Sequence, residues 1–243
     1  MINRYLLAPL FEGWQETMIW SFLQGHMGFA LTDNEAAPTA AQIVVGDFCF
    51  FAGQPNADLA KQAAAPLLIP QDDAWCQVIE SVWGDRVQKA QRYAIQKEPG
   101  VFDTEKLGMY AASLSDGYTI CRIDEEIYRQ ALKSDWSRDL CSQFADYSDY
   151  HTRGLGVAVL HEGQLVAGAS SYSIYDDGIE IEIDTKQEHR QKGLATACGA
   201  SLILECLKRG WYPSWDAHDL RSVALAEKLG YHLEGAYPVY NKK

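Results

Sequence analysis

The stretch HRQKGLAT, residues 189–196, follows the alternating segment IEIEID, residues 179–184, and precedes a long apolar segment. The alternation predicts a strand, and the spacing of the later apolar residues predicts a helix that begins at Lys192 or Gly193. Arg190 and Lys192 then lie at the positive end of the helix dipole, where a cation is disfavoured by about 0.3–1 kcal/mol. No Ser, Thr, Asp or Asn directly precedes Lys192 to cap the free N–H groups.

A bound anion accounts for both features of this helix start. Free amides, a glycine that permits close approach and two flanking cations are typical of a phosphate or pyrophosphate site. The alternative is a solvated loop with incidental charges, and this stretch alone does not separate the two. The stretch matches neither the Walker pattern nor the Rossmann pattern of nucleotide-binding loops.

Two motifs together resemble one known family. Residues 190–195, RQKGLA, resemble the R/Q-x-x-G-x-G/A signature of the GNAT superfamily of N-acetyltransferases, which holds the pyrophosphate of acetyl-CoA. Residues 219–231, DLRSVALAEKLGY, resemble the N-x-x-A/S-x-x-L-Y-x-K-x-G-F helix of that family. The resemblance covers residues 118–243. Within the superfamily, this sequence is similar to a two-domain bacterial branch. It implies a C-terminal GNAT-type acetyltransferase fold with acetyl-CoA as cosubstrate and no metal.

The resemblance also implies which residues bind acetyl-CoA. The strand end should line the acetyl and pantetheine arm, loop amides should hold the pyrophosphate, and two cations should neutralise it. The predicted cofactor contacts are Ile183, Asp184, Thr185, Arg190, Gln191, Lys192, Gly193, Leu194, Ala195, Thr196, Asp219 and Ser222.

The second motif departs from the family pattern at two positions. Asp219 replaces the family's Asn, and Asp is an equally good N-cap for the helix that follows. Ala226 replaces the Tyr that often serves as the general acid, so the proton donor is unassigned. Tyr231 is expected to pack as the aromatic residue after the helix.

The acids of IEIEID are the candidates for catalysis. Alternation places Glu180, Glu182 and Asp184 on one face of the strand. An amine with a pKa near 10.4 must lose a proton before it attacks a thioester, and a carboxylate can accept that proton. In the family that the motifs resemble, the base is often a Glu on this strand, so the resemblance implies Glu180 or Glu182 as the base. The alternative is a partly solvated strand face.

His189, His218 and the serines at residues 170–171 could also contact ligands, although ordinary loop or packing roles explain them.

Composition restricts the partners. The 243 residues carry a formal net charge of −12, which argues against nucleic acid and anionic membranes and tolerates a cationic amine. The six cysteines show no C-x-x-C pair and no zinc-ligand spacing with histidine, so free buried thiols in a reducing, cytoplasmic setting are expected. The apolar N-terminal segment contains charges, and we read it as an amphipathic helix and not as a membrane span.

The order of elements predicts a mixed α/β (α+β) fold. We expect an N-terminal α/β domain of uncertain role over residues 1–110 and a GNAT-like domain over residues 111–243. Helices are expected near residues 9–24, 57–65, 73–90, 124–132, 135–150, 192–209 and 220–229. Strands are expected near residues 29–33, 41–53, 66–70, 92–97, 118–123, 211–217 and 236–240, with three more between residues 154 and 184.

These features lead to one functional hypothesis and one alternative. The hypothesis is an acetyl-CoA-dependent N-acetyltransferase that acts directly on a primary amine of a small molecule or peptide, with a homodimer possible. The alternative is an acyl-CoA-binding sensor or an inactive relative, which Asp219 and Ala226 would permit.

Overall fold

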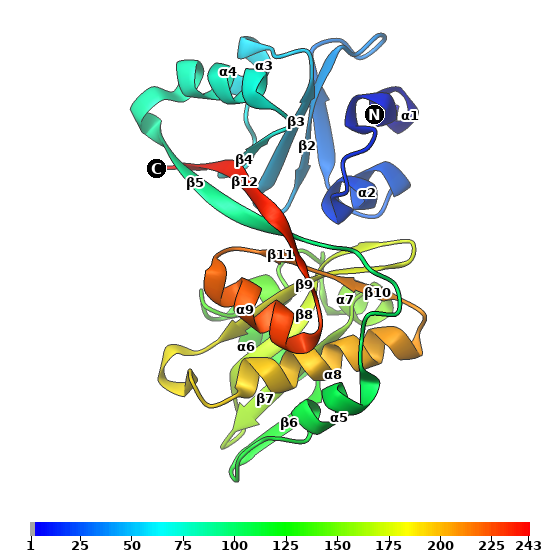
Figure 1. The fold of residues 1–243 in the computed structure, drawn as a ribbon, viewed down its shortest axis with the longest axis vertical. Helices are drawn as coiled ribbons and strands as arrows, with labels where there is room; N and C mark the ends of the chain where they lie inside the picture. Colours follow the sequence, from blue (N-terminus) through cyan, green and yellow to red (C-terminus); the bar gives the residue numbers. More distant parts are fainter. Residues whose placement is uncertain (1–2) are drawn as a thin grey trace. The chain divides into compact units, whose positions relative to one another are not determined.

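A computed structural model describes residues 3–243. The chain forms two compact units, and the predicted mixed α/β fold is confirmed (Figure 1). The first unit contains the chain up to Arg92 together with Ala236–Lys243, and the second contains Tyr93–Gly235. The expected boundary at residue 110 lies inside α5 (Thr104–Ala111) of the second unit. Within residues 3–243, no helix has the length and apolar character needed to cross a membrane.

The first unit is built on a mixed sheet with the strand order β1-β2-β3-β4-β12-β5. β3 and β4 are parallel, and β12 pairs with β4 in the antiparallel sense. The strands are β1 (Phe29–Thr32), β2 (Ala40–Val45), β3 (Phe48–Gly53), β4 (Leu67–Pro70), β5 (Val87–Ile95) and β12 (Leu233–Lys242). The helices are α1 (Arg4–Leu7), η1 (Ala8–Phe11), α2 (Thr17–Gln24), α3 (Ala57–Lys61), α4 (Asp73–Trp83) and η2 (Gly84–Arg86).

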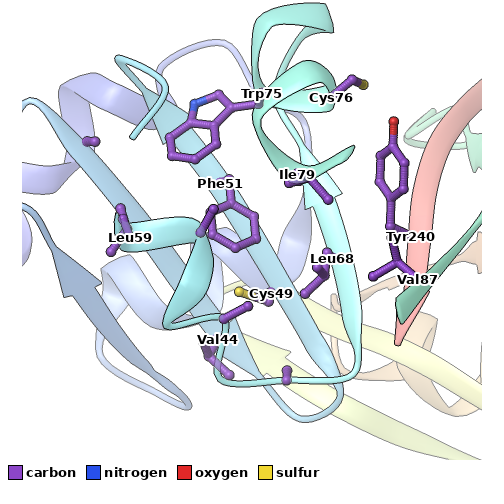
Figure 2. Close-up of a cluster of buried hydrophobic side chains, with 14 residues drawn as sticks. Val44, Cys49, Phe51, Leu59, Leu68, Trp75, Cys76, Ile79, Val87 and Tyr240 are labelled. Atoms are coloured by element: carbon purple, nitrogen blue, oxygen red, sulfur yellow. The ribbon is translucent and has the colours of Figure 1, made fainter. Parts of the chain in front are cut away.

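The core between this sheet and helices α3 and α4 contains Trp75, Phe51 and Tyr240 (Figure 2). The rings of Phe51 and Trp75 lie 5.1 Å apart, and the indole N–H of Trp75 donates to the carbonyl of Gly53 at 2.9 Å. Tyr240 belongs to β12, so the last strand of the chain completes the core of the first unit.

Three predictions for the first unit were wrong. The expected helix over residues 9–24 is not continuous and consists of the end of η1 and, after a break, α2, because Pro9 lacks an N–H and Gly13 adopts a left-handed conformation. The expected strand over residues 41–53 is the hairpin β2–β3, which turns at Gly46 with φ +55°. The expected helix over residues 73–90 ends at Trp83, and the residues from Val87 onward form β5.

The second unit contains a mixed five-stranded sheet of order β10-β9-β8-β7-β6. All its neighbouring strands are antiparallel except β9 and β10, which are parallel. The strands are β6 (Tyr118–Arg122), β7 (Gly156–His161), β8 (Gln164–Tyr175), β9 (Gly178–Thr185) and β10 (Tyr212–Ser214). The short β11 (Asp216–Ala217) follows β10 in the chain but does not belong to this sheet. It pairs with the end of β5.

Helices cover both faces of this sheet. α8 (Leu194–Lys208) packs on β7, β8, β9 and β10, with α5 and α9 (Leu220–Leu229) beside it (Figure 1). α6 (Glu125–Leu132) and η3 (Arg138–Leu140) pack on the other face, and α7 (Tyr147–Arg153) follows η3. The expected helix over residues 135–150 was wrong, since only η3 and the start of α7 are helical there.

All six cysteines are free thiols, as predicted, and five of them are buried, with Cys121 half-buried. Burial raises the pKa of Cys49, Cys141, Cys198 and Cys206 to about 12. These thiols are therefore protonated at neutral pH and poor nucleophiles.

Candidate cofactor and acceptor site

The strands β9 and β10 separate part-way along β9. They pair from Tyr212 opposite Gly178 to Ser214 opposite Glu180, where β10 ends. Over residues 181–185 the opposite edge of β9 remains paired with β8, as far as Thr185 opposite Ala167. Among residues 3–243, no strand pairs with residues 181–185 on the β10 side. That edge therefore offers backbone groups to a ligand, and it includes the predicted contacts Ile183, Asp184 and Thr185.

The loop after β9 leads directly into the start of α8. After η4 (Gln187–His189), Gln191 has φ +61° and Gly193 has φ +78°. The helix begins at Leu194, one residue after the later of the two expected starts, Lys192 and Gly193, and no side chain caps it. A Cβ atom on Gly193 would meet no atom within 4 Å, so the space beside this helix start is open. The first amides of a helix have no intrahelical partners and point toward such a space.

Three cations lie around this helix start. Arg190 is bound back to the strand end, since its Nε donates to the carbonyl of Thr185 at 3.1 Å. The Nζ atom of Lys192 donates to the Tyr118 hydroxyl at 3.0 Å. Lys228 of α9 donates to Thr196 Oγ1 at 3.2 Å, so a third cation comes from a distant segment. Sequence reasoning missed Lys228, although it occupies the Lys position of the second motif.

The acidic face of β9 changes in burial along the strand. Glu180 is only 4% exposed, whereas Glu182 and Asp184 are half-buried. Glu180 is opposite Ser173 of β8 and Ser214 of β10 in the strand register. The hydroxyl groups of both serines are buried and make no hydrogen bond within residues 3–243. Glu180 therefore lies in a polar row across three strands, at the point where β9 and β10 separate.

The other two acids have different surroundings. Glu182 is opposite Ser170, whose hydroxyl bonds to that of Tyr150 at 2.8 Å. Asp184 accepts from the N–H of Thr185 at 2.6 Å and lies 3.7 Å from Arg190. Burial raises the pKa of Asp184, and the Thr185 N–H and Arg190 oppose that rise. Asp184 thus supports the loop.

Three phenols near Glu180 already donate their protons to backbone carbonyls. Tyr175 donates to the carbonyl of Tyr212 at 3.1 Å, Tyr212 to that of Gln96 at 3.2 Å, and Tyr231 to that of Pro213 at 2.6 Å. Burial raises the pKa of all three phenols, and the charge of Glu180 adds to the rise. The protons of these three phenols are therefore already engaged, so none of the three takes the place of the family's tyrosine, which is Ala226 in this chain.

The second motif has structural roles in this fold. Asp219 caps α9 by accepting from the N–H groups of Arg221 and Ser222 at 2.9 and 3.0 Å, as its alternative interpretation expects. The Ser222 hydroxyl accepts from the indole of Trp215 at 3.0 Å. Tyr231 is buried against Trp215, which confirms its predicted packing role. The contact of Asp219 and Ser222 with the cofactor stays a prediction.

The remaining polar candidates divide into a buried group and an exposed one. Ser170 and Ser171 are buried, and their hydroxyl groups form hydrogen bonds with the backbone of Leu155, just before β7. His218 is exposed between β11 and α9. His189 is bonded to Tyr118 and lies beside the loop that precedes α8.

Comparison with known proteins identifies the family. The profile of the GNAT acetyltransferase family matches residues 8–240. The chain belongs to this family. As a GNAT acetyltransferase it is an enzyme, and the family match includes the first unit, beyond the residues 118–243 on which the motif resemblance rests.

Individual relatives agree with this assignment. A protein of Bacillus subtilis (strain 168) called "Uncharacterized N-acetyltransferase YdfB" is 27% identical over 198 residues, which are 80% of this chain and 72% of that protein. The crystal structure of a GCN5-related N-acetyltransferase-like protein from Streptococcus suis 89/1591 is 44% identical, with a TM-score of 0.95 over 99% of this chain and 98% of that one. A GCN5-related N-acetyltransferase from Kribbella flavida shares the fold at 14% identity, with a TM-score of 0.56 over 93% and 94% of the two chains.

Proposed function

We propose that this GNAT enzyme transfers the acetyl group of acetyl-CoA directly to a primary amine. The observation that carries the proposal is the position of the open, uncapped start of α8 directly after the unpaired edge of β9. An extended thioester arm can pair with such a strand edge while its diphosphate meets the helix amides.

The residues around the helix start fit a diphosphate. The open space beside Gly193 permits close approach, and Lys192, Lys228 and Arg190 supply positive charge. This arrangement also resolves the unfavourable position of the cations at the positive end of the helix dipole, because a bound anion would neutralise them. The rest of the protein carries an excess of acids, so this loop is the favoured place for an anionic ligand.

Acetyl-CoA supplies the acetyl group as a thioester. We assign the base to Glu180, with Glu182 as the second candidate, because Glu180 lies at the point where the strands separate. Its carboxylate accepts one proton from the ammonium form of the acceptor, and the neutral amine then attacks. As the N–C bond forms and the C–S bond breaks, the nitrogen releases its second proton to solvent. Solvent returns a proton to the thiolate, whose thiol has an ordinary pKa of about 8.5.

The acceptor is an amine of a small molecule or peptide. Glu180, Glu182 and Asp184 give this region negative charge, which attracts a protonated amine to the site before the base removes its proton. The buried hydroxyls of Ser173 and Ser214 offer further polar contacts beside Glu180.

Calorimetry with acetyl-CoA tests the cofactor site. The double variant Lys192→Glu plus Gly193→Asp places two negative charges at the start of α8 and should weaken binding by more than tenfold, through repulsion of the diphosphate. The matched control, Lys208→Glu plus Gly210→Asp, makes the same changes at the other end of α8, where Gly210 is also left-handed and open. Equal affinity in wild type and the first variant would contradict the proposal.

Turnover separates an enzyme from a sensor. Ala226, fully buried at the position where the family motif has a tyrosine, is the observation that favours an acyl-CoA-binding sensor. Release of free thiol from acetyl-CoA in the presence of a mixed panel of amines should exceed the rate without amines. Tight binding of acetyl-CoA without any amine-dependent release would favour the sensor.

A further inference from the structure

Three aromatic side chains gather beside the loop that precedes α8. Tyr118 begins β6, and its cross-strand partner His161 ends β7. Their rings lie 4.9 Å apart, and the ring of His189 lies 5.3 Å from that of His161 and 5.8 Å from that of Tyr118. The three residues come from separate elements, and the cofactor motif includes none of them.

A directed chain of hydrogen bonds links this cluster to Lys192. The Lys192 ammonium has only donors, so the Tyr118 oxygen accepts at 3.0 Å. The single phenolic proton of Tyr118 is then donated to Nδ1 of His189, also at 3.0 Å. That bond requires an unprotonated Nδ1, so His189 is the neutral tautomer with its proton on Nε2.

The surrounding charges favour the neutral imidazole. Burial lowers the pKa of His189, and the charges of Lys192, His161 and Lys186 lower it further, whereas Glu188 opposes them. The neutral imidazole that the hydrogen bonds require is therefore favoured by its surroundings, while the hydrogen bond from Tyr118 selects the tautomer.

The chain of bonds has a consequence for ligand binding. Lys192 is an exposed residue with a long side chain, and fixing such a side chain opposes binding through lost conformational entropy. We propose that Tyr118 is a positioning residue for phosphate recognition: with His189 as the acceptor of its proton, it holds the Lys192 ammonium beside the start of α8 before acetyl-CoA binds. This inference rests on the proposed function, since it concerns the same anion site.

A double-mutant cycle tests the inference. Calorimetry would measure the Kd of acetyl-CoA for wild type, Tyr118→Phe, Lys192→Met and the double variant. Tyr118→Phe should weaken binding about three- to tenfold, because the Lys192 ammonium loses its acceptor. The double variant should bind like Lys192→Met alone, because Tyr118 acts through Lys192. A general loss of stability would not produce this non-additivity, and kcat at saturating acetyl-CoA should not change in Tyr118→Phe.

Two further variants make the test specific. Tyr147→Phe removes another phenol that contacts a histidine, His151 Nδ1 at 3.4 Å, in the same unit, and should leave the Kd unchanged. His189→Leu removes the proton acceptor and should weaken binding in the same direction as Tyr118→Phe, which keeps the inference testable if Tyr118→Phe does not fold.

The outcomes distinguish this inference from the proposed function. Additive effects of the Tyr118 and Lys192 substitutions, or an unchanged Kd in Tyr118→Phe, would overturn the role of Tyr118 while wild-type binding stands. A wild-type protein that does not bind acetyl-CoA would overturn the proposed function, and the inference with it.

Discussion

At the scale of residues, the two carboxylates of the proposed acceptor site differ in surroundings. Glu180 is nearly fully buried. It lies between Ser173 of β8 and Ser214 of β10, where β9 and β10 separate. Glu182 is more exposed and is opposite Ser170. The alternating sequence predicts that both side chains share a face, but it does not say where a neighbouring strand stops.

Substitution of each carboxylate by its amide tests the base assignment. Glu180→Gln should lower kcat by about 10²–10⁴-fold, the usual contribution of a general base, whereas Glu182→Gln should change it much less. The measurement is thiol release at saturating acetyl-CoA with the best amine of the panel. Full turnover in Glu180→Gln would refute the assignment, and the reverse ranking would transfer the role to Glu182.

Residues of the site that are near one another in sequence could be predicted, and those that only the fold brings together could not. Arg190, Lys192 and Gly193 belong to one motif, so sequence finds them as a group. Tyr118 and Lys228 reach the same helix start from β6 and α9, which are distant in the chain. Periodicity and spacing carry no information about such contacts.

At the scale of elements, the wrong predictions share a physical origin. Hydrophobic runs identify buried segments, but local backbone chemistry decides where one element ends. Gly46 turns one apolar run into the hairpin β2–β3, and the segment after Trp83 becomes β5 although the helical pattern continues. The motif-bearing elements β9, α8 and α9 were predicted well, because strong periodicity and glycine stops coincide there.

The connection between β1 and β2 provides a pH-dependent element. Asp33 accepts from the N–H groups of Thr39 and Ala40 at 3.0 Å each and from the Thr39 hydroxyl at 2.6 Å. Burial raises the pKa of Asp33, but these hydrogen bonds and one from Thr32 outweigh it, so the pKa falls to about 2. The charged form is therefore favoured by folding.

The lowered pKa of Asp33 predicts how the free energy of unfolding depends on pH. Because the pKa in the folded state lies below the ordinary value of about 3.9, the stabilisation is complete above pH 4 and is lost as the pH falls toward 2. Urea unfolding between pH 5 and pH 2 should show a smaller loss of unfolding free energy for Asp33→Asn than for wild type. Asp85→Asn, at an exposed position of the same unit, is the control and should follow wild type. Parallel curves for all three proteins would contradict the prediction.

At the scale of the whole molecule, the first unit is discontinuous in sequence. The chain leaves it after Arg92 and returns at Ala236, so β12 pairs with β4 and places Tyr240 in the core. The Tyr240 hydroxyl donates to Glu80 Oε1 at 2.5 Å. Sequence predicts two α/β regions, but it does not indicate that the last strand belongs to the first of them.

Truncation of Tyr240 should destabilise the first unit selectively. Tyr240→Ala removes a fully buried aromatic ring, a change that typically costs about 3–5 kcal/mol. Hydrogen exchange followed by mass spectrometry should show faster exchange in peptides of β2, β3 and β4 than in peptides of β7, β8 and β9. Tyr240→Phe keeps the ring and loses the hydroxyl with its bond to Glu80, so it should have a much smaller effect. Equal acceleration in both units would show that they unfold together.

The return of the chain at Ala236 also sets an order of events during protein synthesis. Residues 93–235 of the second unit precede residues 236–243, so the ribosome synthesises the second unit before it synthesises the strand segment that completes the first unit. Until then β4 lacks its β12 neighbour, and its exposed edge is open to pairing with other chains. The sheet of the first unit can therefore be completed only after residues 236–243 have been synthesised.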